Sequence, residues 1–175
     1  MNPLAVKLLD AARAGFHVLA TAESCTGGLV AGAITDVPGA SAIFDRGFVT
    51  YTNRAKVQML GVEPQTLRDH GAVSEEVAHE MAAGAFARSQ ASVAVAITGI
   101  AGPGGSGHKP EGRVCFGIAW EHGLRTETVD FGALGRESVR RAATDHALRL
   151  MLDCILRETH DSEANRRRNA AELRS

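Results

Sequence analysis

The sequence predicts an α/β fold, a three-layer α/β/α sandwich built around a mixed β-sheet and forming a single domain. Amphipathic segments alternate with short apolar segments along the chain, as expected when helices cover both faces of a sheet. Residues 92–98, SVAVAIT, are almost wholly apolar, which is typical of a strand that is buried on both faces. With 175 residues, 45% of them hydrophobic, the chain is long enough to bury one substantial core.

The first part of the chain contains most of the expected helices. Helices are predicted over residues 3–14, 27–34, 55–60, 64–70 and 75–87, and strands over residues 17–21 and 46–51. Gly15 ends the first helix, and Asn53 is expected to cap the short helix that Gly61 ends. Ser74 is expected to cap the last of these helices, whose first turn carries two glutamates. Ser24 falls between the first strand and the helix that follows it.

The second part of the chain predicts the antiparallel portion of the sheet. The apolar strand over residues 92–98 leads into a glycine-rich loop, and the strands over residues 113–120 and 125–131 form a hairpin. A long final helix is predicted over residues 136–157. The domain is expected to span residues 1–158, and residues 159–175, which lack an apolar face, to form a polar tail that is flexible or a frayed helix.

The charge balance and the cysteines restrict the classes of partner and compartment. Nineteen basic and twenty acidic residues give a formal charge of −1, which indicates no general affinity for nucleic acid or for an anionic membrane. No segment has the roughly 18 unbroken apolar residues of a membrane span. The three cysteines form no CxxC pair of the kind that a zinc site or a disulfide framework needs, so we expect reduced thiols in a cytoplasmic protein. We expect neither a metal nor a cofactor. We also expect a homo-oligomer.

The stretch AESCTGGLVAG places a serine and a cysteine side by side where a strand passes into a helix. The backbone N–H groups of Cys25, Thr26, Gly27 and Gly28 lie at the positive end of that helix, which favours an anion. Ser24 fits two roles: an N-cap, or a nucleophile whose tetrahedral oxyanion binds the adjacent amides. Cys25 is a second candidate nucleophile, because the helix end can acidify its thiol, although such a cysteine also often packs inward.

A serine nucleophile needs a base, and the histidines do not supply an evident one. The seven histidines form no recognisable Ser-His-Asp set and no H-x-x-x-H metal pair. The alternative base is a lysine whose pKa is lowered by burial, and the chain has only three lysines. Lys56 follows the strand that ends at Tyr51, so both side chains are expected to point towards Ser24. An exposed lysine on a short helix is the other interpretation of this spacing.

The glycine-rich segment TGIAGPGGSGHKPEG leaves the buried strand at the edge where open α/β sheets bind ligands. A nest of backbone amides around a phosphate or carboxylate is expected there, and the candidate substrate-binding residues are Thr98, Gly99, Gly102, Gly104 and Gly105. The segment matches neither the Walker A nor the GxGxxG pattern, so an ordinary mobile loop is the alternative.

Two arginines one helical turn apart begin the final helix. Arg136 and Arg140 are placed to offer guanidinium groups to a phosphate or a carboxylate. Solvated arginines on a helix surface are the alternative.

Four motifs in order resemble one family. They are AESCTGG, the segment FDRGFVTYTNRAK that continues to LGV, HGAVSEEVA, and TGIAGPGG followed by KPEG. Together they resemble the CinA C-terminal-type domain, the nicotinamide-nucleotide amidohydrolase family, over residues 4–155. The resemblance implies hydrolysis of the carboxamide of nicotinamide mononucleotide to nicotinic acid mononucleotide and ammonia.

The resemblance also assigns roles to individual residues. It implies that Ser24 is the nucleophile, that Lys56 is its base and that Tyr51 helps to relay the proton, with the amides near Cys25 holding the oxyanion. A small-molecule nucleotide is then the partner, and no metal is required. The alternative is a nucleotide-binding regulatory domain of the competence or damage-inducible type that does not turn over its ligand.

Overall fold

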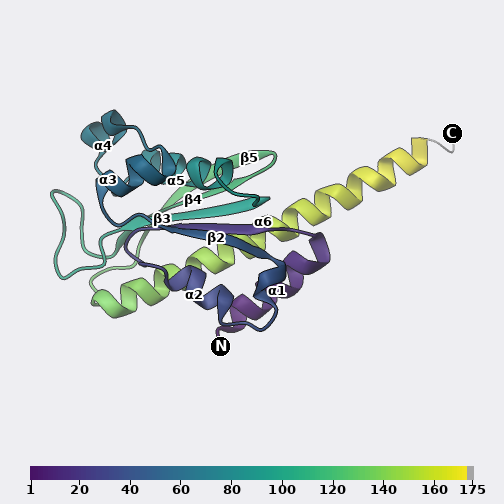
Figure 1. Cartoon of the computed structure of the whole chain (residues 1–175), viewed down its shortest axis with the longest axis horizontal. Helices are drawn as coiled ribbons and strands as arrows, with labels where there is room; N and C mark the ends of the chain where they lie inside the picture. Colours follow the sequence, from purple (N-terminus) through teal and green to yellow (C-terminus); the bar gives the residue numbers. More distant parts are fainter. Residues whose placement is uncertain (173–175) are drawn as a thin grey trace.

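A computed structural model shows a five-stranded mixed sheet with the strand order β2-β1-β3-β4-β5 (Figure 1). The structure describes the chain from residue 1 to residue 172, and the side chains from residue 1 to residue 160. The strands are β1 (Leu19–Glu23), β2 (Phe44–Val49), β3 (Val93–Gly99), β4 (Arg113–Trp120) and β5 (Gly123–Asp130). Strand β1 lies parallel to both β2 and β3, whereas β4 is antiparallel to β3 and β5.

Helices cover both faces of the sheet, which confirms the three-layer α/β/α sandwich and its single domain (Figure 1). One layer contains α1 (Pro3–Gly15), α2 (Leu29–Thr35) and α6 (Arg136–Glu172), and a 3-10 turn over Ala40–Ala42 follows α2. The other contains α3 (Asn53–Ala55), a π-helical turn η2 (Lys56–Leu60), α4 (Pro64–His70) and α5 (Glu75–Ala87). The sheet therefore separates two apolar cores, one on each face.

The two cores differ in the size of their side chains. The core beneath α1, α2 and α6 contains many leucine, isoleucine and valine residues, whereas the core beneath α5 is rich in alanine. A Cβ atom on Gly117 of β4 would overlap the carbonyl oxygen of Ala78 in α5. One on Gly84 would overlap the carbonyl oxygen of Leu60. Helix α5 thus packs closely on the sheet and on η2, and this close packing fixes the position of the turn that begins with Lys56.

Most of the predicted elements occur, with shifts at their ends. Helices α4 and α5 have the expected bounds, and Ser74 caps α5 by accepting a hydrogen bond from the Val77 N–H. The prediction that Asn53 caps the short helix was wrong: Thr52 accepts the Ala55 N–H, and Asn53 is the first helical residue. Strand β2 begins at Phe44 and stops before Tyr51, so Tyr51 lies in the connection after the strand.

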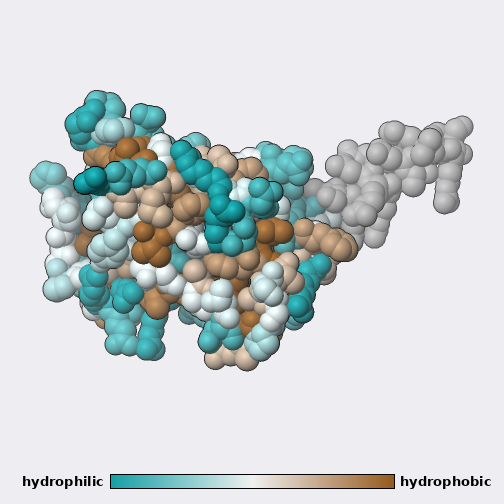
Figure 2. Space-filling view, viewed as in Figure 1, coloured by the Kyte–Doolittle hydropathy of each residue, from teal (hydrophilic) through white to brown (hydrophobic). Residues whose placement is uncertain are grey.

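Helix α6 is longer than predicted and continues to Glu172, and in Figure 1 it extends well away from the sheet. Residues 173–175 lie outside the described residues, and the division of the chain after residue 158 stays a prediction. None of the helices in the described part has the length and apolar content to cross a membrane. On the face seen in Figure 2, hydrophobic and hydrophilic residues are mixed, with no single continuous apolar band. The expected homo-oligomer stays a prediction.

Two glycines in helices give a matched test of this packing. Gly84→Ala should lower the free energy of unfolding by about 1–3 kcal/mol, because the methyl group overlaps the Leu60 backbone. Gly32→Ala, in α2, meets no atom within 4 Å and should raise it by about 0.5–1 kcal/mol through the better helix propensity of alanine. Urea unfolding of both variants measures the difference. Equal effects of the two changes would contradict the close packing of η2 on α5.

Candidate active site

The carboxyl ends of the three parallel strands meet at one edge of the sheet. After β1 the chain passes to β2 on one side and later to β3 on the other, so the ends of β1 and β3 flank a topological switch point. Open α/β sheets bind ligands in such crevices. The Ser24 N–H donates to the Ile97 carbonyl of β3 at 2.9 Å, which places Ser24 at this crevice.

A buried serine–lysine pair lies at the switch point. Lys56 Nζ donates a hydrogen bond to Ser24 Oγ at 2.8 Å and another to the Thr50 carbonyl oxygen at 2.9 Å. The exposed fractions of Ser24 and Lys56 are 8% and 1%. Burial disfavours the ammonium form and lowers the pKa of Lys56 from its ordinary value of 10.5 to about 8. With this pKa, roughly a tenth of Lys56 is neutral at pH 7, and this fraction is able to accept the proton of Ser24.

Local structure after β2 carries Lys56 inward. The Thr52 hydroxyl caps α3, and the chain then widens into the π-helical turn that begins at Lys56. Gly61 ends the turn with a φ of 73°, a conformation that glycine adopts without strain. π-Helical turns are rare and often occur at functional sites.

Glu23 is a site residue that the sequence interpretation missed. Its side chain is fully buried and accepts hydrogen bonds from the N–H groups of Gly28, Val30 and Ala31 at 2.8–3.1 Å. A carboxylate here satisfies the free amides at the start of α2 and complements the positive end of the helix. The available signal was an acidic residue directly before Ser24 at the end of an otherwise apolar strand.

The turn between Ser24 and α2 uses only some of the amides expected for an oxyanion. The Gly28 N–H donates to Glu23, and the Gly27 N–H donates to the Ser24 carbonyl oxygen at 3.1 Å. The prediction that these two amides are free to bind a ligand was therefore wrong. Their φ values of 101° and 62° explain why two glycines follow Thr26. Within the described residues, the N–H groups of Cys25 and Thr26 have no protein acceptor, so these two remain as candidates among the predicted oxyanion donors.

Cys25 packs inward from this turn. Its side chain is 5% exposed, and its Sγ would lie 3.1 Å from a Cβ atom placed on Gly99. Burial raises the pKa of the Cys25 thiol to about 11. Only a very small fraction is then thiolate near neutral pH, so the thiol is a poor competitor of Ser24 as a nucleophile.

The pocket beside the serine–lysine pair has a volume of about 190 Å³. Its lining includes Ser24, Cys25, Tyr51, Lys56, Thr98, Gly99 and Arg136, together with Asn53, Ala72, Val73 and Ala101. Sequence interpretation assigned no role in a binding or catalytic site to the last four, although Ala72 and Val73 lie within the HGAVSEEVA motif. The lining joins all three predicted catalytic residues to three of the predicted substrate-binding residues.

Tyr51 and Arg136 meet at the pocket. Arg136 donates to the Tyr51 hydroxyl oxygen at 2.6 Å and to the Gly102 carbonyl oxygen at 2.9 Å. Tyr51 is 55% exposed, and the described hydrogen bonds of its hydroxyl include none to Ser24 or Lys56. The pair therefore offers a guanidinium and a phenol to a ligand whose reactive end reaches Ser24.

The glycine-rich loop contributes only its first residues to the pocket. Thr98 and Gly99 line it, with the Thr98 hydroxyl donating to the Ala72 carbonyl oxygen at 2.7 Å. Gly102, Gly104 and Gly105 do not line it. The Gly104 N–H donates to the Glu111 carboxylate, so part of the expected amide nest is satisfied within the loop. Lys109 ties the loop to the carbonyl groups of His70 and Val73.

Arg140 does not line the pocket. Its Nε donates to the Cys25 carbonyl oxygen at 3.0 Å and its Nη2 to the Thr26 carbonyl oxygen at 2.9 Å. Arg140, which was predicted to bind a phosphate, therefore contacts the backbone of the turn that carries Ser24 instead.

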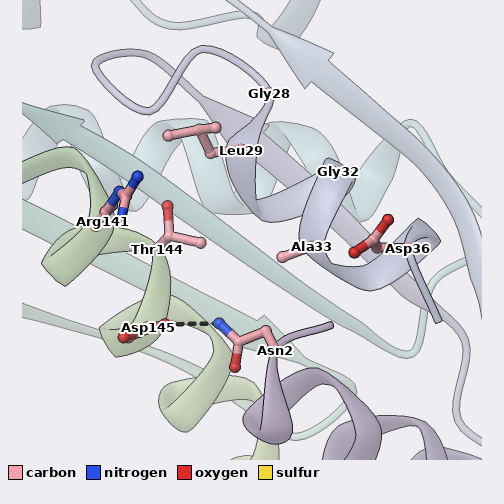
Figure 3. A pocket seen from close by; sticks show the side chains of 9 residues that line it. All are labelled: Asn2, Gly28, Leu29, Gly32, Ala33, Asp36, Arg141, Thr144 and Asp145. Atoms are coloured by element: carbon pink, nitrogen blue, oxygen red, sulfur yellow. Dashed lines mark hydrogen bonds between the residues drawn. The ribbon is translucent and has the colours of Figure 1, made fainter. Parts of the chain in front are cut away.

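A larger cavity, of about 590 Å³, lies elsewhere (Figure 3). It is enclosed by the start of α1 together with α2 and α6, and Asn2 donates to Asp145 across it at 2.7 Å. Neither Ser24 nor Lys56 lines it. The described residues contain no group of three or more His, Cys, Asp or Glu side chains able to hold a metal ion. We therefore place the candidate active site at the smaller pocket, where the reactive groups converge.

The fold and this pocket define a class: single-domain α/β proteins with a buried serine and lysine at the switch point of a mixed sheet. The sequence model described as the CinA C-terminal domain matches residues 1–155, and the chain belongs to that family.

Relatives with assigned names cover most of the chain. The nicotinamide-nucleotide amidohydrolase PncC of Escherichia coli K12 is 50% identical over 151 residues, which cover 86% of this chain and 92% of the relative. PncC of Enterobacter agglomerans is 49% identical over 154 residues, which cover 87% and 93%.

Solved structures agree with the fold. The competence/damage inducible protein CihA of Agrobacterium tumefaciens is 48% identical with a TM-score of 0.82, covering 86% of this chain and 92% of its own. A CinA superfamily protein of Klebsiella pneumoniae is 34% identical with a TM-score of 0.85, covering 88% and 96%. These similarities confirm the family that the four motifs resemble.

The burial of Lys56 predicts a pH dependence of stability that is independent of any activity. Between the folded pKa of about 8 and the ordinary value of 10.5, the unfolded chain binds more protons than the folded chain. The free energy of unfolding should therefore rise with pH across this window, relative to Lys56→Met, by on the order of 2 kcal/mol. Urea unfolding of both proteins from pH 7 to pH 10.5 measures it. A difference that does not change with pH would show that Lys56 titrates as an exposed lysine.

Proposed function

We propose that this chain is an amidohydrolase that converts nicotinamide mononucleotide to nicotinic acid mononucleotide and ammonia, with Ser24 as the nucleophile. The observation that carries the proposal is the 2.8 Å hydrogen bond between Lys56 Nζ and Ser24 Oγ in a buried pocket. The carboxamide substrate is taken from the names of the relatives that are about half identical to the chain. A serine and a neutral lysine are sufficient for acyl transfer from an amide.

Acylation begins with proton transfer from Ser24 Oγ to neutral Lys56 Nζ. The oxygen attacks the carboxamide carbon, and the developing oxyanion accepts hydrogen bonds from the N–H groups of Cys25 and Thr26. Lys56, now an ammonium, gives its proton to the amide nitrogen as the carbon–nitrogen bond breaks. Ammonia leaves, and the acyl group remains as an ester on Ser24.

Deacylation reverses these proton transfers with water as the nucleophile. Lys56 takes a proton from water, the resulting hydroxide attacks the ester carbon, and the same two amides hold the oxyanion. Lys56 then returns a proton to Ser24 as the ester bond breaks. The product is the carboxylic acid, and the enzyme returns to its starting protonation state without a metal or cofactor taking part in any step.

The pocket fits the reactive end of the substrate. A volume of about 190 Å³ accommodates a pyridine carboxamide, with the ribose phosphate extending towards the mouth. Arg136 is the proposed phosphate partner, because its guanidinium is exposed beside Tyr51. Thr98 and Gly99 form the wall beneath the ring. We place the reaction in the cytoplasm, in keeping with three cysteines that are all free.

The nucleophile is tested by two neighbouring variants. Ser24→Ala should abolish ammonia release from nicotinamide mononucleotide, because it removes the attacking oxygen. Cys25→Ala should keep most of the activity, because the thiol forms no bond in the reaction. Ammonia assays, with circular dichroism as the folding control, measure both. An active Ser24→Ala would contradict the assignment, and a wild-type protein that binds the nucleotide without releasing ammonia would favour the regulatory alternative.

The base is tested by the pH dependence of the rate. Because only neutral Lys56 accepts a proton, kcat/KM should rise with pH through about 8 and then level off. Lys56→Ala should lower kcat/KM by about 10²-fold or more, and Lys56→Arg should not restore it because a guanidinium stays protonated. Tyr51→Phe should cost less, since it removes one hydroxyl at the pocket mouth. If Lys56→Arg keeps the wild-type rate and the same rise with pH, Lys56 is not the base.

A further inference from the structure

The backbone turn that carries Ser24 is held by a side chain that lies far away in the sequence. Arg140 of α6 donates from Nε to the Cys25 carbonyl oxygen at 3.0 Å and from Nη2 to the Thr26 carbonyl oxygen at 2.9 Å. A planar guanidinium that binds two successive carbonyl groups fixes the orientation of both peptide planes. The partly buried position of Arg140 makes these bonds stronger than they would be in water.

We propose that Arg140 is a positioning residue that aligns the oxyanion hole by holding the Cys25 and Thr26 carbonyl groups. The proposal rests on the hydrolytic function proposed above, because an oxyanion hole has a role only in acyl transfer. It assigns to Arg140 an action on the transition state and none on the binding of the substrate.

Peptide geometry supplies the mechanism. The carbonyl of Cys25 and the N–H of Thr26 belong to one planar peptide unit and point in opposite directions. When Arg140 draws the Cys25 carbonyl towards α6, the Thr26 N–H is turned away from α6. The Ser24 carbonyl, which accepts the Gly27 N–H at 3.1 Å, fixes the preceding peptide plane and with it the Cys25 N–H.

The two N–H groups belong to residues at the edge of the pocket. Ser24 and Cys25 both line it, and Thr26 follows directly in the chain. Neither amide has a protein acceptor in the part of the chain that the structure describes.

The turn is held from its other side by Glu23. Its carboxylate accepts the N–H groups of Gly28, Val30 and Ala31, so Arg140 binds the carbonyls of the turn while Glu23 binds the amides that follow. Gly27 follows with a φ of 62°, in the left-handed region that favours glycine, and so turns the chain between the two groups of contacts. Donors aligned before the reaction stabilise an oxyanion without reorganising during it.

The test compares variants of Arg140 with a neighbouring control. Arg140→Met removes both donors while keeping part of the apolar stem, and Arg140→Lys keeps the charge but lacks the planar fork. Arg141→Met is the control, because Arg141 is 76% exposed and contacts Glu137 on the helix surface. Steady-state rates with nicotinamide mononucleotide and with its thioamide analogue, over a range of pH, give the readouts.

The expected result is a loss in kcat of about 10–100-fold for Arg140→Met, with KM within about twofold of wild type. The kcat of Arg140→Lys should lie between those of Arg140→Met and the wild-type protein. The rise of kcat/KM near pH 8 should be unchanged, because Lys56 keeps its surroundings. The preference for the oxygen amide over the thioamide should fall, since sulfur accepts hydrogen bonds poorly and gains less from a well-aligned hole. Arg141→Met should match wild type.

Several outcomes would overturn the proposal. A raised KM with unchanged kcat would make Arg140 a substrate-binding residue, and unchanged rates would remove it from the mechanism. If Arg140→Lys is slower than wild type but keeps the same preference for the oxygen amide over the thioamide, Arg140 stabilises the fold and does not align the oxyanion hole. This variant decides the question if Arg140→Met does not fold. Failure of the hydrolytic function itself is separate, because it would appear as absent ammonia release in the wild-type protein.

Discussion

The burial of the Lys56 ammonium group at the end of β1 is the constraint on which the rest of the site depends. Removing a lysine from water disfavours its charge, and two hydrogen bonds, to Ser24 Oγ and to the Thr50 carbonyl, direct the nitrogen. The same burial that destabilises the protein lowers the pKa of Lys56 to about 8, as its proposed role of general base requires. The fold must therefore supply stability elsewhere, and the two apolar cores on either face of the sheet do so.

Three features of the fold bring the two side chains together. The order β2-β1-β3 places the ends of three parallel strands side by side, so that Ser24 and Thr50 follow adjacent strands. The close approach of η2 to α5 at Gly84 holds the turn that carries Lys56. Glu23 anchors the start of α2 next to Ser24. Each of these features fixes the position of the backbone that carries a side chain of the site, as expected for a site built on rigid elements.

The sequence was sufficient for the fold class and for grouping Ser24, Tyr51 and Lys56 in one candidate site, because these depend on local patterns. Apolar periodicity predicted the strands and helices, and the scarcity of lysine pointed to Lys56. The partners of Arg140 were not predictable in this way, since the contact joins residues 115 positions apart. Spacing alone makes Arg136 and Arg140 equivalent, yet one lies at the pocket and the other beneath the turn. The loss of the Gly28 amide to Glu23 has the same origin, because only the bend of the chain after β1 brings the carboxylate to α2.

Burial also bears on which of the two adjacent nucleophiles reacts. A low-dielectric surrounding penalises the charged form of every group, so it lowers the pKa of Lys56 to about 8 and raises that of the Cys25 thiol to about 11. A thiol acts as a nucleophile through its thiolate, whereas a serine keeps its proton until a neutral base takes it in the reaction itself. In the proposed reaction, the same desolvation therefore favours neutral Lys56 as the base of Ser24 and disfavours the Cys25 thiolate. The buried environment of Ser24, Cys25 and Lys56 therefore favours oxygen over sulfur as the nucleophile, although both side chains line the pocket.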